Sequence, residues 1–161
     1  MFKSLFTQKK EPIYAPLTGK VVLLEEVPDP VFSQKMMGDG VAIIPTSNQV
    51  FSPVDGEILN VFPTKHAISI RSKTGAELLI HMGIETVKLN GEGFNVFVNN
   101  GDKIKKGNPI AEFDIEKVLN TGTNVITPII LVNGDQFKIE NKVSDQSITG
   151  GQDMMMEITK I

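Results

Sequence analysis

The chain has only two histidines, His66 and His81, and these are the residues best suited to chemistry. Residues 66–70 and 77–81 have the pattern of two short strands, and residues 72–75 between them (Ser-Lys-Thr-Gly) have the pattern of a turn. If the turn has two central residues, antiparallel pairing sets the two histidines directly opposite each other. A slip of two residues leaves them diagonal neighbours, and a slip of one puts them on opposite faces. We therefore predict that the two imidazoles meet on one β-face.

Two adjacent imidazoles fit three kinds of chemistry. A zinc site takes three or four protein ligands, and even with Glu85 recruited the chain has no cysteine and no further histidine to complete it. Paired acid–base catalysis on a phosphodiester is disfavoured by the acidic charge balance. In a phosphohistidine relay, one neutral imidazole attacks a phosphoryl group while the other donates a hydrogen bond to the transferred oxygens. Thr64 stands two residues before His66, where its hydroxyl could set the tautomer of that ring.

The residue types alone leave a plainer alternative open, in which the histidines are structural members of a sheet.

The amino-acid composition excludes several classes of function. With a net charge of −3, an extended nucleic-acid surface is not expected. The absence of cysteine excludes disulfides and thiolate zinc sites and suits a reducing compartment. No apolar run approaches the roughly 20 residues that span a bilayer, and the start has no signal-peptide pattern, so we expect a cytoplasmic protein.

The elements that must position the histidines are short strands between Gly, Pro, Asn and Asp residues. We expect a flexible N-terminal tail over residues 1–12 and a single domain over residues 13–161. Strands this short and this frequent predict an all-β fold, a compact antiparallel β-sandwich or barrel with one or two short helical turns. The expected strands are residues 21–24, 41–44, 58–62, 95–98, 109–113, 129–132 and 137–139.

Helical patterns are scarce, and one short motif occurs twice. Residues 30–37 could form one or two turns that stop at Gly38, and residues 114–120 could form another with Asp114 as its N-cap. A Pro-x-x-Gly segment before a strand occurs at residues 15–21 and again at 52–58. Such a repeat predicts two similar β-motifs that pack on each other.

The motifs around the histidines resemble the glucose-family IIA domain of the bacterial phosphoenolpyruvate:sugar phosphotransferase system. The resemblance runs from about residue 14 to the C-terminus. Its most specific parts are His-x-Gly-Ile-Glu-Thr-Val, which begins at His81, and Gly-Glu-Gly-Phe, which begins at Gly91. The matching segments are residues 64–67, 79–87 and 89–94, with shorter matches at 15–19, 27–29, 31–32 and 37–40. The fold that the resemblance implies is a β-sandwich of the duplicated hybrid motif type with a shallow active-site depression.

The resemblance also implies a phosphoryl carrier. His81 would accept the phosphoryl group from the phosphocarrier HPr, and the IIB domain of a glucose-type sugar permease would receive it. His66 would stabilise the group, and Thr64 would orient His66. No metal would be required, although zinc could bind at His66 and His81, either adventitiously or between two molecules. We expect a free-standing monomer, and a domain excised from a larger permease stays open as the alternative. It would bind no nucleic acid and would meet the membrane only through the permease.

Family members present an apolar rim with acidic residues to their partners. By position the acids here would be Asp29 and Glu85, the latter where many members have aspartate. Two rival functions stay open: a regulatory module of the same fold that binds partners according to its phosphorylation state, and a metal-dependent hydrolase. The apolar rim positions are Val31, Phe32, Met36, Met37, Phe62, Leu79 and Val87.

Overall fold

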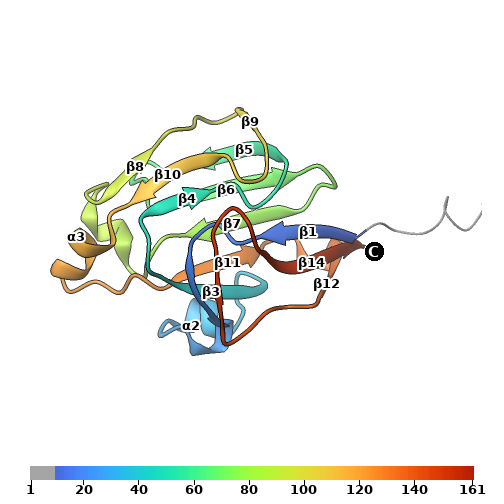
Figure 1. The fold of residues 1–161 in the computed structure, drawn as a ribbon, viewed down its shortest axis with the longest axis horizontal. Helices are drawn as coiled ribbons and strands as arrows, with labels where there is room; N and C mark the ends of the chain where they lie inside the picture. Colours follow the sequence, from blue (N-terminus) through green and yellow to red (C-terminus); the bar gives the residue numbers. More distant parts are fainter. Residues whose placement is uncertain (1–9) are drawn as a thin grey trace, which may run out of the picture.

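The computed structural model describes residues 10–161, which form three antiparallel sheets (Figure 1). The largest has the strand order β13 (Gln146–Ile148), β2 (Gly19–Leu23), β3 (Asp39–Pro45), β11 (Thr127–Leu131), β7 (Glu77–His81), β6 (Ala67–Ser72), β5 (Gly56–Val61) and β9 (Lys103–Ile104). A second has the order β1 (Lys10–Tyr14), β14 (Met154–Lys160), β12 (Phe137–Glu140), and a third β4 (Gln49–Phe51), β10 (Pro109–Phe113), β8 (Phe94–Val96).

Helices in this part of the chain are short connectors. The α-helices are α2 (Pro30–Ser33) and α3 (Ile115–Asn120), and the 3₁₀ turns are η1 (Leu24–Glu26), η2 (Thr86–Leu89) and η3 (Gly134–Gln136). Asp114 caps α3 as predicted, since its Oδ1 accepts a hydrogen bond from the Lys117 N–H at 3.1 Å. The predicted helix over residues 30–37 is shorter than expected. It ends at Ser33, and Lys35 beyond it has a φ of 58°, which no α-helix accommodates.

The first and last described strands lie side by side at the right of Figure 1. β1 begins at Lys10, which pairs with Thr159 of β14. The expected tail boundary at residue 12 is therefore wrong for residues 10–12, which belong to a sheet. The carboxylate of Glu11 also accepts a hydrogen bond from Ser72 Oγ at 2.8 Å, and this bond ties β1 to the large sheet. The rest of the predicted tail, residues 1–9, lies outside the described residues.

The repeated Pro-x-x-Gly segments precede equivalent strands, β2 and β5, and hold each other in place. The N–H of Phe51 donates to the carbonyl of Pro16 at 2.8 Å, and the N–H of Tyr14 donates to the carbonyl of Pro53 at 2.9 Å. These reciprocal bonds confirm that the two motifs pack on each other.

Two hydrophobic clusters fill the fold, and the smaller one supports the histidines. The larger cluster contains Ile68, Ile70 and Ile80. The smaller contains Ala67 and Leu79, which lie on β6 and β7, together with residues of η1 and α2. Because side chains alternate along a strand, β6 and β7 contribute to both clusters. The smaller cluster packs β6 and β7 against α2 at the ends of these strands that carry the histidines.

Candidate functional site: a histidine pair at the ends of two strands

The rings of His66 and His81 contact each other, as predicted. Their centroids lie 4.9 Å apart and their planes meet at 78°, an edge-to-face arrangement. His66 immediately precedes β6, and His81 is the last residue of the neighbouring strand β7. The two imidazoles therefore share one end of a β-hairpin.

The predicted strand register is wrong by one residue. Ala67, not His66, is the partner of His81. The cause is the turn: the N–H of Ser72 donates to the carbonyl of Ala76 at 2.8 Å, so the loop has three residues instead of two. Gly75 supplies the positive φ, 96°, that such a loop requires at its last position.

A one-residue slip should have put the rings on opposite faces of the sheet, and a second local feature prevents this. Lys65 has a left-handed backbone with a φ of 60°, in a turn closed by its N–H, which donates to the carbonyl of Phe62 at 2.7 Å. His66 therefore lies beyond the regular part of β6, where strict alternation does not set its direction. Its carbonyl still accepts a hydrogen bond from the Met82 N–H at 2.8 Å, which anchors its backbone to the segment after β7.

The hydrogen-bond partner of His81 defines its tautomer. Nδ1 of His81 lies 2.7 Å from the carbonyl oxygen of Gly83. A carbonyl oxygen can only accept, so Nδ1 must carry the proton. Nε2 of His81 is then left with a lone pair, as a nucleophile requires.

The carbonyl of Gly83 is held by its surroundings. The backbone of Gly83 has a φ of 79°, and a Cβ at this position would lie 2.5 Å from Thr86 Cγ2 and 2.9 Å from the Asn124 carbonyl. The fully buried Thr86 in turn donates its hydroxyl to the carbonyl of Met82 at 2.6 Å. Only glycine fits here without displacing the chain.

His66 has a partner of a different kind. Its Nδ1 lies 2.6 Å from Thr64 Oγ1, and a hydroxyl can either donate or accept. When Thr64 donates, Nε2 of His66 carries the ring proton and can donate it to a third group. The two histidines can thus play complementary parts, an acceptor Nε2 on His81 and a donor Nε2 on His66.

Both rings are neutral at pH 7. Burial, followed by repulsion from His81 when that ring is protonated, lowers the pKa of His66 to about 4. His66 is 5% exposed. Burial also lowers the pKa of His81, although its bond to Gly83 and the negative charge of Asp29 act in the opposite direction. A neutral imidazole is the form that can attack an electrophile.

Two aromatic side chains flank the pair. The ring of Phe32 lies 4.9 Å from that of His81, and the ring of Phe62 lies 5.7 Å from that of His66. Phe32 is carried by α2, whose N-terminus is capped by Asp29 through a 2.9 Å bond from the Val31 N–H. The aromatic rings exclude water from one side of each imidazole.

The nine predicted partner-binding residues fall into three groups by exposure. Phe32 and Leu79 are buried, at 4% exposure each, so they lie beneath the surface and support it. Asp29 and Phe62 are half-buried. Those at the surface are Val31, Met36, Met37, Glu85 and Val87.

Two contributors to the site were not predicted from sequence, the carbonyls of Gly83 and Asn124. Gly83 could have been found from its place two residues after His81, since a histidine commonly bonds a nearby carbonyl. Asn124 accepts the Ile84 N–H at 2.9 Å from a loop 40 positions along the chain, and no local pattern indicates that contact.

The pair alone offers few ligands to a metal. Within residues 10–161, no group of three or more His, Cys, Asp or Glu residues could hold an ion. Nδ1 of each ring is occupied by a hydrogen bond, so the two Nε2 atoms would be the only protein ligands. A tetrahedral zinc would need its other ligands from water or another molecule.

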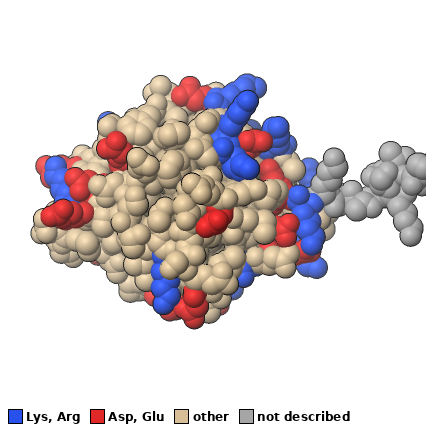
Figure 2. All heavy atoms as spheres, in the orientation of Figure 1, with Lys and Arg blue, Asp and Glu red and all other residues tan. Residues whose placement is uncertain are grey.

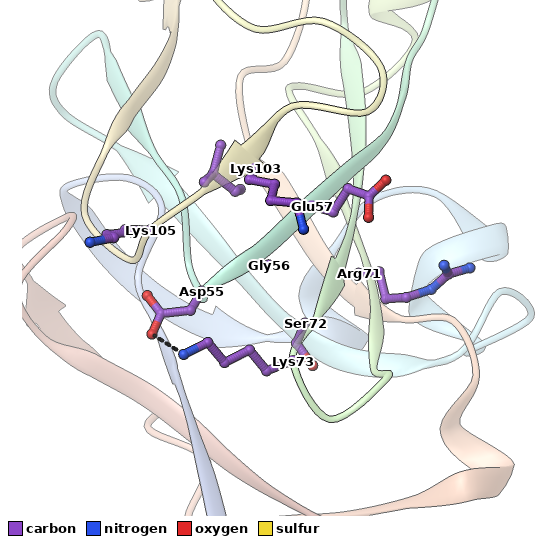
Figure 3. A pocket seen from close by; sticks show the side chains of 9 residues that line it. Asp55, Gly56, Glu57, Arg71, Ser72, Lys73, Lys103 and Lys105 are labelled. Carbon is purple, nitrogen blue, oxygen red and sulfur yellow. Dashed lines mark ion pairs between the residues drawn. The ribbon is translucent and has the colours of Figure 1, made fainter.

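A pocket of about 390 Å³ lies at the far end of β5 and β6, opposite the histidines (Figure 3). Its lining includes the Asp55–Lys73 ion pair, 3.7 Å long, and the basic residues Arg71, Lys103 and Lys105. In Figure 2 basic side chains gather at the upper right, the side on which β9 and the β6–β7 turn lie. Neither histidine lines this pocket, so it is separate from the candidate site.

Comparison with known proteins identifies the family. The family model described as phosphoenolpyruvate-dependent sugar phosphotransferase system, EIIA 1, matches residues 11–137. The glucose-specific EIIA components of Staphylococcus epidermidis and Staphylococcus aureus are each 46% identical to this chain over 164 residues, covering 99% of both chains. The solved structure of glucose permease IIA from Mycoplasma capricolum superposes with a TM-score of 0.87 at 36% identity, covering 94% of this chain and 97% of the other.

The antiparallel β-sandwich fold and these relatives define the class of this protein. It is a phosphotransferase component, a carrier of phosphoryl groups in sugar uptake. The chain belongs to the EIIA 1 family of the phosphoenolpyruvate-dependent sugar phosphotransferase system. No helix within residues 10–161 has the length and apolarity to cross a bilayer.

Proposed function

We propose that this protein takes a phosphoryl group from HPr onto Nε2 of His81 and passes it to the IIB domain of a glucose-type sugar permease. The observation that carries this assignment is the 2.7 Å contact between His81 Nδ1 and the Gly83 carbonyl. It leaves Nε2 of His81 as a nucleophile. The partner of His66 is the Thr64 hydroxyl, which can donate or accept, so Nε2 of His66 can serve as the hydrogen-bond donor to the phosphoryl group.

In the transfer step, Nε2 of neutral His81 attacks the phosphorus atom as the bond from phosphorus to the donor breaks, and the donor keeps that electron pair. The imidazole of His81 gains positive charge, which the Gly83 carbonyl and the charge of Asp29 stabilise. His66 donates its Nε2–H to a phosphoryl oxygen. Thr64 keeps His66 in the tautomer that can do so. Delivery to IIB reverses these steps at a new acceptor.

The partners dock on the exposed apolar rim around the pair. Met36 is 69% exposed and Val87 is 54% exposed, and Met37 and Val31 are each 39% exposed. Methionine side chains adapt to different shapes, which suits one surface that must receive both HPr and IIB. Asp29 and Glu85 would meet basic residues of these partners.

The carrier works as a cytoplasmic monomer, and its only link to the membrane is the permease. It requires no resident metal, because the two imidazoles and the phosphoryl donor complete the chemistry. Zinc at His66 and His81 would occupy both Nε2 atoms and would therefore compete with phosphorylation.

Incubation with phosphoenolpyruvate, enzyme I and HPr tests the assignment. We expect one acid-labile phosphate per chain, located on His81 by mapping of phosphopeptides, and none on the His81→Gln variant. The matched His66→Gln variant should still be charged, but should transfer poorly to IIB. Phosphate on a histidine of the His81→Gln variant would overturn the assignment of roles.

A further inference from the structure

Three Asn-Gly steps occur in the chain, at Asn90, Asn100 and Asn133. In such a step the main-chain nitrogen of the glycine can attack the Asn side-chain amide carbon. A carbon–nitrogen bond forms, ammonia leaves, and the resulting succinimide is opened by water to aspartate or isoaspartate. Glycine favours this because no Cβ shields its nitrogen and its backbone rotates freely. How far each site is protected depends on the hydrogen bonds that hold its amide and that nitrogen.

Asn133 is protected through its side chain. Its Nδ2 donates to the Gly75 carbonyl at 2.9 Å, and its Oδ1 accepts the Glu77 N–H at 2.9 Å. Both ends of the amide are therefore engaged, and the residue is half-buried. The amide carbon cannot turn toward the following nitrogen unless both bonds open.

Asn100 is protected at both reacting groups. Its Oδ1 accepts the Val61 N–H at 2.7 Å. The attacking nitrogen, that of Gly101, donates to the Ile58 carbonyl at 2.8 Å. Attack at this step would need both bonds to open.

Asn90 differs from both. It is exposed, and within residues 10–161 neither its side-chain amide nor the N–H of Gly91 takes part in a hydrogen bond. It ends the 3₁₀ turn η2 with a left-handed backbone, φ 53°, and Gly91 follows with a φ of 92°. A Cβ on Gly91 would lie 3.8 Å from the carbonyl oxygen of Thr64, so this loop borders the turn that carries Thr64.

We propose that Asn90 is a site of spontaneous deamidation in the folded protein, at which a new carboxylate arises beside the Thr64 turn. In its isoaspartate form the product also lengthens the main chain by one carbon. The Leu89–Glu92 hydrogen bond of the same loop, 3.0 Å in the unmodified chain, spans that position. The modification is chemical and needs no enzyme, and it is independent of how phosphoryl transfer is assigned.

Ageing of the full chain at mildly alkaline pH tests this, with peptide mapping by mass spectrometry and isoaspartyl methyltransferase labelling as readouts. We expect deamidation at Asn90, with incorporation of heavy oxygen from labelled water. Asn100 and Asn133 should react at least about fivefold more slowly, since protecting hydrogen bonds must open first. In the urea-unfolded chain all three steps should react at similar rates. The matched Asn90→Gln variant should lose the labelling at this position.

Two results would overturn the proposal. One is deamidation of Asn100 or Asn133 in the folded chain as fast as that of Asn90. The other is a folded chain that stays intact at all three positions over a period in which the unfolded chain is converted. Because the readout is the mass of a peptide, it is unaffected by whether His81 carries phosphate.

Discussion

The carbonyl oxygen of Gly83 lies 2.7 Å from Nδ1 of His81, and this single contact makes two adjacent histidines chemically different. Nδ1 of His66 faces a hydroxyl instead, 2.6 Å away. An obligate acceptor fixes the tautomer of one ring, whereas a hydroxyl can adapt to either tautomer of the other. In the proposed transfer, the nucleophile and the hydrogen-bond donor are thus distinguished by partners two residues from each ring.

Replacing Thr64 by valine should impair the donor role of His66 and leave the nucleophile intact. The substitution keeps the shape and removes the hydroxyl bonded to Nδ1. We expect charging by HPr to persist, while transfer to IIB slows about 5- to 30-fold, the effect of 1–2 kcal/mol. Rapid-quench kinetics measures both steps. Thr64→Ser, which retains the hydroxyl, is the control, and equal slowing in both variants would contradict the role given to Thr64.

Replacing Gly83 by alanine should destabilise the fold more than replacing Gly75. Both glycines have positive φ, 79° and 96°, so both variants incur backbone strain. Only at Gly83 would the new Cβ also overlap neighbours, 2.5 Å from Thr86 Cγ2, because nothing lies within 4 Å of such an atom at Gly75. We expect the free energy of unfolding in urea to fall by about 1–3 kcal/mol more for Gly83→Ala. Equal losses would show that the site tolerates the added methyl group.

Stability should fall with acidification through the titration of His66. Its pKa is about 4 in the folded protein, below the ordinary histidine value of 6.5. The unfolded chain therefore takes up a proton first as the pH drops. The stabilisation is fully present above pH 6.5 and is lost progressively down to about pH 4, by roughly 2–4 kcal/mol.

Urea unfolding across this pH range, compared between the wild type and His66→Gln, isolates that contribution from the carboxylates. The free energy of unfolding of the wild type, relative to that of His66→Gln, should decrease as the pH falls. Parallel curves would mean that the pKa of His66 is the same in the folded and unfolded states.

A charge on the exposed apolar rim should block docking without affecting the fold. Met36 is 69% exposed, so Met36→Glu should change the free energy of unfolding by no more than about 0.5 kcal/mol. Charging by HPr should nevertheless slow at least about tenfold, because an apolar contact is replaced by a solvated charge. Leu119→Glu, on α3 and 53% exposed, is the control for an added charge elsewhere. If both variants are charged at the normal rate, the docking surface lies away from Met36.

Strand patterns in the sequence predicted much of the fold. The seven expected strands correspond to β2, β3, β5, β8, β10, β11 and β12, each with continuous or alternating apolar residues between turn residues. Strands such as β9 and β13 were missed because they are two or three residues long with a single apolar residue each, so only their pairing with β5 and β2 defines them. The length of the β6–β7 loop was also misjudged, since two- and three-residue turns have similar composition.

The candidate site was predictable where it depends on side chains and unpredictable where it depends on the backbone. The contacts of His66 with His81 and of Thr64 with His66 were predicted and are present, but not for the predicted reason, because Thr64 and His66 lie in the turn before β6 and not on a strand face. The left-handed backbone of Lys65, which brings the rings together despite the register, has no signature in its residue type.

The three-residue loop between β6 and β7 lies about 20 Å from His66, because six residues of strand at roughly 3.3 Å each separate His66 from Ser72, where the loop begins. It touches neither ring, yet it decides which residue faces His81, because one residue more or fewer would move every partner along the strand. The register therefore depends on the number of residues in this loop and not on the side chains at positions 73 and 74. Natural variation in this loop should be rich in substitutions and poor in insertions and deletions.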